Sequence, residues 1–311
     1  MMHAGGRPHD DRWSRLVALL ETLACALIWG SSFVAVKAAL RYTGPFTIAG
    51  IRYFLAFLIL VPWLFRSDPR PRVLLRKHGL RFALMGLTQY TIGNGALFFA
   101  LRSIPATTGS LALCLIPIPV ILLAYGRLKE RPHLLQVLGI AGAIGGGILF
   151  LAPGVSVSGS TIEWAALLVA IVSFSAFPVL GREVARNRTV NTLPLTAFPL
   201  GIGGGVLLIV AACVEGIPSM PLGTWAILLG LALVNTLLAY LLFNHSLQRL
   251  QAVEANVMLN LSPIATALIA WGALGEQLLP IQIAAMLLVV AGTSLVQWRK
   301  RVLPLGTEEI R

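Results

Sequence analysis

Two stretches of the sequence decide the fold: LCLIPIPVILLAYGRLKE at residues 113–130 and LNLSPIATALIAWGALGE at residues 259–276. At a constant offset of 146 they share a mid-segment proline, a glycine and a final glutamate. The same offset gives 14 identities, without gaps, between residues 101–150 and 247–296. The chain therefore contains an internal repeat, in which the main matches are Pro117 with Pro263, Gly126 with Gly272, Glu130 with Glu276 and Gly146 with Gly292.

The composition is that of a membrane protein. Of the 311 residues, 57% are apolar and 12% are charged, and the mean hydropathy is +0.83. Soluble domains carry about 25% charged residues, so a soluble globular protein is excluded. The lack of long polar or low-complexity tracts also excludes a disordered chain.

Apolar windows between charged or Pro/Gly breaks predict ten membrane-spanning helices of about 20 residues each. The first follows a basic N-terminus but is too long for a signal peptide, so we expect it to be retained. The three cysteines lie in apolar windows and are expected to be buried, unreactive thiols. The predicted spans are residues 16–40, 45–65, 82–101, 107–125, 134–152, 162–181, 192–213, 223–244, 252–274 and 281–298.

Positive charge lies on one side of the predicted helices. Of the 24 Lys and Arg residues, 20 fall in the two tails or in the breaks after spans 2, 4, 6 and 8. Positive loops stay in the cytoplasm, so we expect both termini to be cytoplasmic. The net charge of +12 then faces anionic lipid. We expect no nucleic-acid partner, because no basic stripe with interleaved aromatic residues lies outside the membrane.

Each repeat unit holds five spans, and an odd number makes the second unit enter the membrane upside down. We therefore predict an all-α integral membrane fold with ten transmembrane helices in two inverted five-helix repeats. Alternating-access carriers have this architecture, with the substrate site near the midplane. The first spans of the two units match less tightly and place Lys37 opposite Arg182. The predicted parts are a cytoplasmic N-tail (1–15), a first repeat (16–152), a second, inverted repeat (162–298) and a cytoplasmic C-tail (299–311).

Several motifs resemble one transporter family. The first span carries WGSSF at residues 29–33, and Gly44-Pro45 followed by Arg52 begins the second span. Together with the paired prolines, glycines and glutamates of spans 4 and 9, these residues resemble the EamA family of the drug/metabolite transporter superfamily, over roughly residues 16–298. The resemblance implies an inner-membrane carrier of small metabolites, often an exporter of amino acids or related compounds.

Interrupted helices at matching places in two repeats indicate a carrier's binding site. Pro117 and Pro263 each free the carbonyl four residues earlier, which needs a partner inside a membrane; a simple packing kink is the alternative. Uncharged polar residues at midspan either join helices or line a wet cavity. The predicted substrate-binding residues are Trp29, Ser32, Gln89, Tyr90, Asn94, Pro117, Asn235, Tyr240, Asn260, Ser262 and Pro263.

The ionisable residues of the spans have competing interpretations. Arg52 lies about 10 Å into its helix and could attract a substrate carboxylate, but a structural partner or an extended side chain at the outer interface is favoured. Lys37 is expected to reach the outer interface. Glu21 and Glu254 lie near the cytoplasmic starts of their spans, where each is either a proton carrier or a solvated or ion-paired group.

We therefore predict a secondary transporter that moves small polar metabolites and can act as a monomer. The alternatives are a carrier of nucleotide-sugar, phosphorylated or lipid-linked substrates, a carrier of lipophilic drugs, and a channel. An intramembrane enzyme is least supported, because the aspartates Asp10, Asp11 and Asp68 all lie outside the spans. The sequence predicts no cofactor and no metal site.

Overall fold

The computed structural model describes residues 8–67, 71–104, 106–129, 134–151, 159–185, 190–274 and 279–297. Throughout these ranges the regular structure is helical, with no strand. Seven helices are long and apolar enough to cross a membrane, and residues 134–149 and 280–296 form two shorter apolar helices. Large apolar side chains on their outward faces, such as Leu122 and Leu287, are exposed as lipid-facing residues would be. The chain is a multi-pass helical membrane protein.

The first half contains five helical segments, and the third and fourth of them are divided into shorter helices. The predicted span 82–101 is continued on its N-terminal side by α3, which begins at Pro71 and makes helical much of the basic stretch expected to be a loop. Proline is well suited to a first helical position, because its missing N–H has no partner there in any case. The elements are α1 (Pro8–Ala39), α2 (Pro45–Ser67), α3 (Pro71–Gly86), η1 (Leu87–Asn94), α4 (Gly95–Ala100), α5 (Ala106–Ala112), η2 (Leu113–Leu115), α6 (Pro117–Leu128) and α7 (Leu134–Leu151).

The second half has the same order of elements. Its third and fourth segments are again divided into shorter helices. They are α8 (Thr161–Ala185), α9 (Thr192–Val214), α10 (Leu222–Ala232), η3 (Leu233–Leu238), α11 (Ala239–Ser246), α12 (Ala252–Met258), η4 (Leu259–Leu261), α13 (Ser262–Leu274) and α14 (Pro280–Gln297).

The irregular turns recur at the repeat offset. The π-helical turns η1 and η3 begin at Leu87 and Leu233, which are 146 residues apart. The 3₁₀ turns η2 and η4 begin at Leu113 and Leu259, again 146 apart, and each ends two residues before a proline. The two halves therefore depart from regular helix at the same places.

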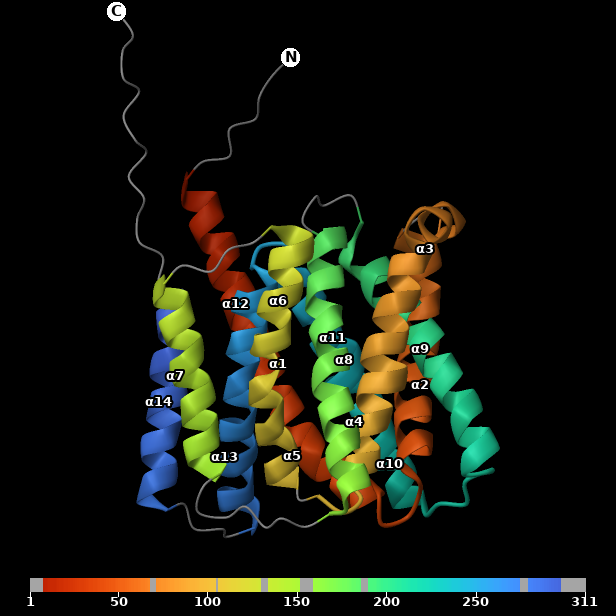
Figure 1. Cartoon of the computed structure of the whole chain (residues 1–311). Coiled ribbons are helices and arrows are strands. Elements are labelled where there is room, and N and C mark those ends of the chain that lie inside the picture. Colours follow the sequence, from red (N-terminus) through yellow and green to blue (C-terminus); the bar gives the residue numbers. More distant parts are fainter. Residues whose placement is uncertain are drawn as a thin grey trace, which may run out of the picture.

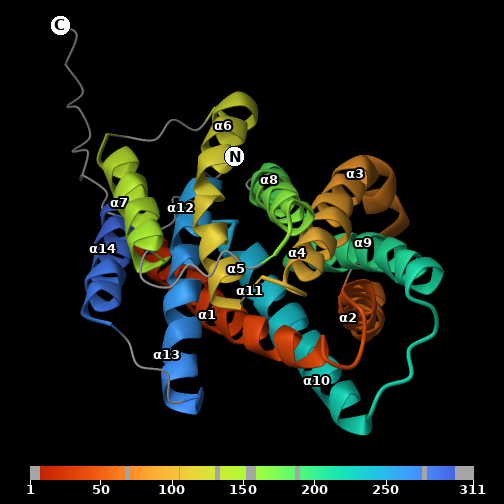
Figure 2. The same cartoon turned by 60° about the horizontal axis from the view of Figure 1, so that its bottom comes forward.

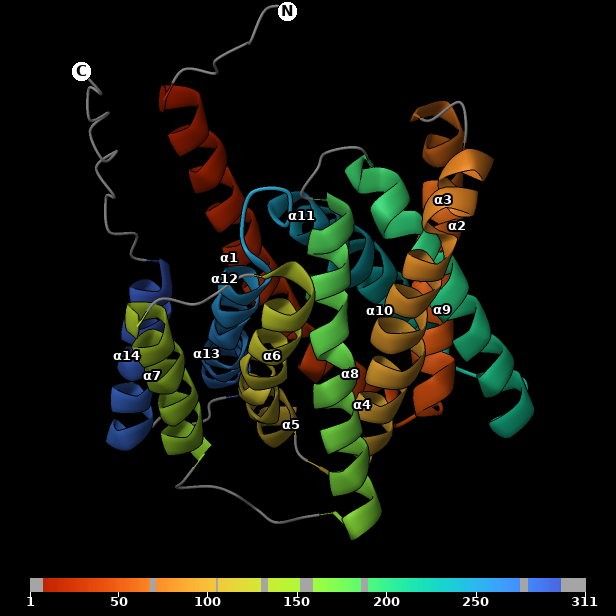
Figure 3. The same ribbon diagram turned by 45° about the horizontal axis from the view of Figure 1, so that its top comes forward.

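The helices form one bundle in which α1 passes through the middle. Figure 1 shows the beginning of α1 and the end of α14 on the same side of the bundle. In Figure 2, α7 and α14 lie together at one edge, while α2 and α9 lie at the other; both pairs are packed directly against each other. Figure 3 shows α8 between α6 and α4, both of which it contacts.

Two cations make corresponding contacts in the two halves. Lys37 Nζ donates to the carbonyls of Leu101, at 2.6 Å, and Ile104, at 3.1 Å. Arg182 Nη1 donates to the carbonyl of Leu247, 2.9 Å away, which is the repeat partner of Leu101. Each cation binds carbonyls at the end of the third segment of its own half, where helix carbonyls lack partners. Lys37 is therefore held against the bundle by these carbonyls.

One expectation about the cysteines is wrong. Cys25 and Cys114 are buried, but Cys213 is exposed on α9. An apolar window does not determine which face of a helix points outward, and Cys213 lies on the outer face.

Candidate functional site

A cavity lies at the centre of the bundle, between the two halves. The cavity volume is about 110 Å³, and one water needs roughly 10–15 Å³. The cavity therefore has room for several waters or one small metabolite. Its walls come from α1, α2, η1, α4, α5 and η2 of the first half, and from α8, α11, α12, η4 and α13 of the second.

Arg52 of α2 lies in the wall of this cavity and is 3% exposed. Its Nε donates to Thr236 Oγ1 at 2.6 Å, its Nη1 to Ser32 Oγ at 2.8 Å, and its Nη2 to the carbonyl of Asn235 at 2.8 Å. The guanidinium carbon is 5.1 Å from the centre of the Tyr53 ring. Arg52 thus points inward to partners on α1 and η3, which agrees with the structural-partner interpretation; it does not extend to the outer interface.

The widened turn η3 provides the acceptor for Arg52. The Asn235 carbonyl also accepts a bond from Trp29 Nε1 at 3.0 Å. In the first half the equivalent carbonyl, that of Gln89, accepts Asn94 Nδ2 at 2.7 Å. A carbonyl released from helical bonding inside a membrane needs another partner, and here a side chain fills that need in each half.

Asn235 itself joins helices. Its Nδ2 donates to the carbonyl of Ile28 at 2.5 Å and to Ser31 Oγ at 3.0 Å. Both acceptors are on α1, so Asn235 fixes α1 against η3 and thereby orients the carbonyl that Arg52 uses.

Aromatic rings form a continuous wall of the cavity. Trp29 and Tyr240 have ring centres 5.0 Å apart, and Tyr240 contacts Phe177 at 5.7 Å. Tyr90 packs behind this wall, 5.0 Å from Tyr240 and 4.8 Å from Tyr53. Gln89 Nε2 donates to the Tyr240 hydroxyl at 2.8 Å, which links the two halves across the cavity.

The two mid-span prolines follow 3₁₀ turns that satisfy the carbonyls they release. The amide of Ile116 donates to the Leu113 carbonyl, and that of Ser262 donates to the Leu259 carbonyl. The turns also meet each other, because Asn260 Nδ2 donates to the Cys114 carbonyl at 3.4 Å. The prolines therefore shape the helices, and their released carbonyls are not left for a ligand.

Most of the predicted site residues come together. Tyr90, Pro117 and Asn235 lie outside the lining, Tyr90 behind the aromatic wall and Asn235 between helices. Arg52, for which carboxylate binding was the less favoured interpretation, also lines the cavity, and so does Asn256, which was not predicted. The sequence did not indicate that these faces of α2 and α12 point inward. The predicted residues that line it are Trp29, Ser32, Gln89, Asn94, Tyr240, Asn260, Ser262 and Pro263.

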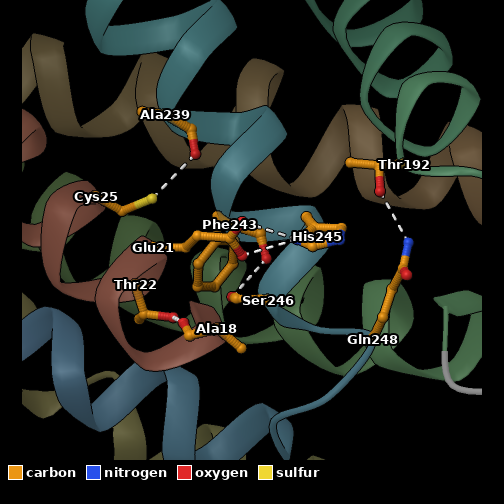
Figure 4. Close-up of polar contacts among 10 residues, drawn as sticks. All are labelled: Ala18, Glu21, Thr22, Cys25, Thr192, Ala239, Phe243, His245, Ser246 and Gln248. Carbon is orange, nitrogen blue, oxygen red and sulfur yellow. Dashed lines mark hydrogen bonds and ion pairs between the residues drawn. The ribbon is translucent and has the colours of Figure 1, made fainter. Parts of the chain in front are cut away.

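A Glu–His contact and an Arg–Glu ion pair join the two halves at the end of the bundle where α1 begins. Glu21 on α1 lies 2.8 Å from His245 Nδ1 on α11, and Figure 4 shows the two side chains facing each other. Beside them, Cys25 Sγ donates to the Ala239 carbonyl. Arg15 pairs with Glu254 at 3.0 Å, and Glu254 also accepts the Gln251 amide as part of a helix cap. Both glutamates are therefore engaged in contacts away from the cavity lining.

Glu215 explains the Gly44-Pro45 motif. Its carboxylate accepts the backbone N–H groups of Phe46, at 3.0 Å, and Thr47, at 2.7 Å, at the start of α2. A carboxylate is favourable at a helix N-terminus because the free N–H groups and the helix dipole are positive there. A Cβ on Gly44 would overlap this carboxylate, so the glycine leaves the space that the cap requires.

A polytopic helical protein with a cavity between two similar halves belongs to the class of membrane transport proteins, and sequence comparison assigns the family. The sequence model of the EamA-like transporter family matches residues 16–152 and again residues 161–298. The chain belongs to the EamA-like transporter family.

Relatives from several organisms are also named as transporters or exporters. The "uncharacterized transporter YyaM" of Bacillus subtilis is 25% identical, with 87% of this chain and 90% of that protein covered. The "uncharacterized inner membrane transporter YedA" of Escherichia coli K12 is 27% identical, covering 94% and 95%. The "probable terminal-alkyne amino-acid exporter" of Streptantibioticus cattleyicolor is 26% identical, covering 91% and 94%. A solved crystal structure shares the fold at a TM-score of 0.72 and 17% identity, covering 89% and 95%.

Proposed function

We propose that this protein is a secondary transporter that moves small polar metabolites across the inner membrane by alternating access, with export of amino acids or related compounds as its task. The observation that carries the proposal is the central cavity, which both halves line with amide, hydroxyl and aromatic side chains. A site built from two similar halves changes its exposure when one half rocks against the other.

The proposal includes ten transmembrane helices in two inverted repeats, with both termini in the cytoplasm. Its support comes from the irregular turns that recur 146 residues apart and from the family match in each half. An even number of crossings agrees with the beginning of α1 and the end of α14 lying on one side (Figure 1). The excess of Lys and Arg in the predicted tails and even-numbered breaks makes that side cytoplasmic.

Amino acids are the favoured substrate class on two grounds. The relative from Streptantibioticus cattleyicolor bears the name of an amino-acid exporter. The cavity also combines one cation with neutral hydrogen-bonding groups, which suits a small molecule with both a charged and an apolar part.

A phosphorylated or nucleotide-sugar substrate is the second candidate, and Arg52 is the observation that favours it. We rank it lower because a multiply charged phosphate calls for several cations, and Arg52 is the one Lys or Arg among the residues that line the cavity. Lys37 on α1 lies outside the lining and binds two carbonyls.

Counterflow into vesicles tests the proposal directly. Purified full-length protein in liposomes preloaded with an unlabelled amino acid mixture should accumulate labelled amino acid transiently, because a carrier exchanges substrate across the membrane. Protein-free liposomes provide the baseline. If neither amino acids nor other small polar metabolites enter above that baseline, the transport proposal is wrong.

A further inference from the structure

The five glutamates of the described residues lie outside the cavity lining and make other contacts. Within the helices that surround the cavity, Glu21 faces His245 and Glu254 faces Arg15. Glu215 caps α2, and the remaining glutamates bind groups near helix ends. Those are Glu163, which contacts Ser103 and Ser160, and Glu183, which pairs with Arg81 and Arg127.

Arg52 is therefore a buried cation whose described partners are neutral oxygens and aromatic rings. A guanidinium has five N–H donors, and three are used by Thr236, Ser32 and Asn235. Two donors remain, one on each terminal nitrogen, and a carboxylate in the cavity can accept hydrogen bonds from them. Because an unpaired charge inside a membrane is costly, an anionic group in the cavity would find a prepared site.

Two acceptors elsewhere in the cavity lack partners in the described structure. Asn256 Oδ1 on α12 and Ser262 Oγ on α13 are buried and have no hydrogen bond. Both residues line the cavity, and they are 5% and 8% exposed. Unsatisfied buried oxygens are uncommon in folded proteins and indicate a missing partner. A protonated amine, which has three donors, can serve both.

We propose that the cavity is a zwitterion site: Arg52 binds the carboxylate of the substrate, and Asn256 with Ser262 accepts hydrogen bonds from its amino group. The aromatic wall of Trp29 and Tyr240 packs against the apolar remainder. The inference rests on the proposed transport function and narrows it to substrates that carry both charges. It also requires the recognition groups to come from both halves, with Arg52 in the first and the two acceptors in the second.

Three related compounds separate these contributions in the wild-type protein. Phenylalanine has both groups, 3-phenylpropanoate lacks the amine, and 2-phenylethylamine lacks the carboxylate. Binding is measured as the rise in melting temperature of the purified full chain with ligand concentration. Phenylalanine should bind most tightly, 3-phenylpropanoate should bind more weakly, and the amine alone should bind least.

Variants assign each end of the ligand. Arg52→Gln should weaken 3-phenylpropanoate and phenylalanine about tenfold to hundredfold, as expected for lost hydrogen bonds to a charged group, and leave 2-phenylethylamine unchanged. Asn256→Ala should weaken phenylalanine and leave 3-phenylpropanoate unchanged. Asn244→Ala is the matched control, because Asn244 is also buried and also has an unpartnered Oδ1 but lies outside the lining.

Comparing the three ligands distinguishes a lost ligand contact from a general loss of stability in a variant. A structural role of Arg52 would weaken all three compounds alike, and that result would overturn the proposal. Wild-type protein that prefers the amine would overturn it as well. If Arg52→Gln does not fold, the wild-type ranking decides. Counterflow of neutral or cationic metabolites alone would leave the transport function standing and refute the zwitterion site.

Discussion

Arg52 illustrates how much the meaning of one residue depends on its neighbours in space. Its depth in the helix follows from counting residues after Pro45, and that count was compatible with a side chain reaching the outer interface. The direction is set by oxygens on α1 and η3, which are 20 and about 184 residues away in sequence. No local pattern in α2 reports where those oxygens lie, so the sequence alone left two interpretations open.

Gly44 gives a prediction at the residue scale. Gly44→Ala should displace the Glu215 carboxylate from the amides of Phe46 and Thr47, at a cost of about 0.5–2 kcal/mol for the lost cap. The measurement is the melting temperature of the purified protein. Gly223→Ala is the control, since a Cβ there meets nothing within 4 Å. Equal melting temperatures for the two variants would contradict the capping role.

The elements divide into those that a sequence pattern specifies and those that packing specifies. Pro117 and Pro263 predicted interruptions of two helices, and a 3₁₀ turn ends two residues before each of these prolines. The π-helical turns η1 and η3 had no such signal, because a widened turn needs no special residue and is held by contacts such as Trp29 with Asn235. Polar residues at Gln89 and Asn235 marked the right region without indicating the geometry.

The close packing of α7 against α14 can be tested at Gly292. A Cβ on Gly292 would lie 2.5 Å from the Ala143 nitrogen and from the Gly139 carbonyl, so the helices touch through their backbones. Gly292→Ala should force them apart, at a cost of about 1–3 kcal/mol for overpacking, and lower the melting temperature by several degrees. Gly145→Ala on α7 should leave it unchanged, because a Cβ there meets nothing within 4 Å. A Gly292→Ala protein as stable as that control would show that the contact is not tight.

Across the whole molecule, the internal repeat found in the sequence recurs in the structure. The offset of 146 that aligns the prolines also relates the irregular turns and the two carbonyls, those of Leu101 and Leu247, that Lys37 and Arg182 bind. Eight predicted site residues line one cavity because midspan polar groups from both halves converge there. Tyr90 and Asn235 show the limit of this reasoning: a polar or aromatic residue at the right depth can equally well face a neighbouring helix.

Alternating access requires that the cavity open to each side of the membrane in turn. Cys114 lines the cavity, whereas Cys25 is buried elsewhere and Cys213 is exposed on the outer surface. A protein with Cys25→Ala and Cys213→Ala therefore keeps one thiol, in the cavity. Lys129→Cys and Gly216→Cys, each made after Cys114→Ala, serve as markers for the cytoplasmic and outer sides.

The measurement is labelling with a small, membrane-impermeant thiol reagent, applied to right-side-out and to inside-out vesicles. We expect Cys114 to react in both preparations and a bound substrate to slow the reaction, whereas each marker should react in one preparation only. Reaction of Cys114 from a single side, with or without substrate, would contradict alternating access through this cavity.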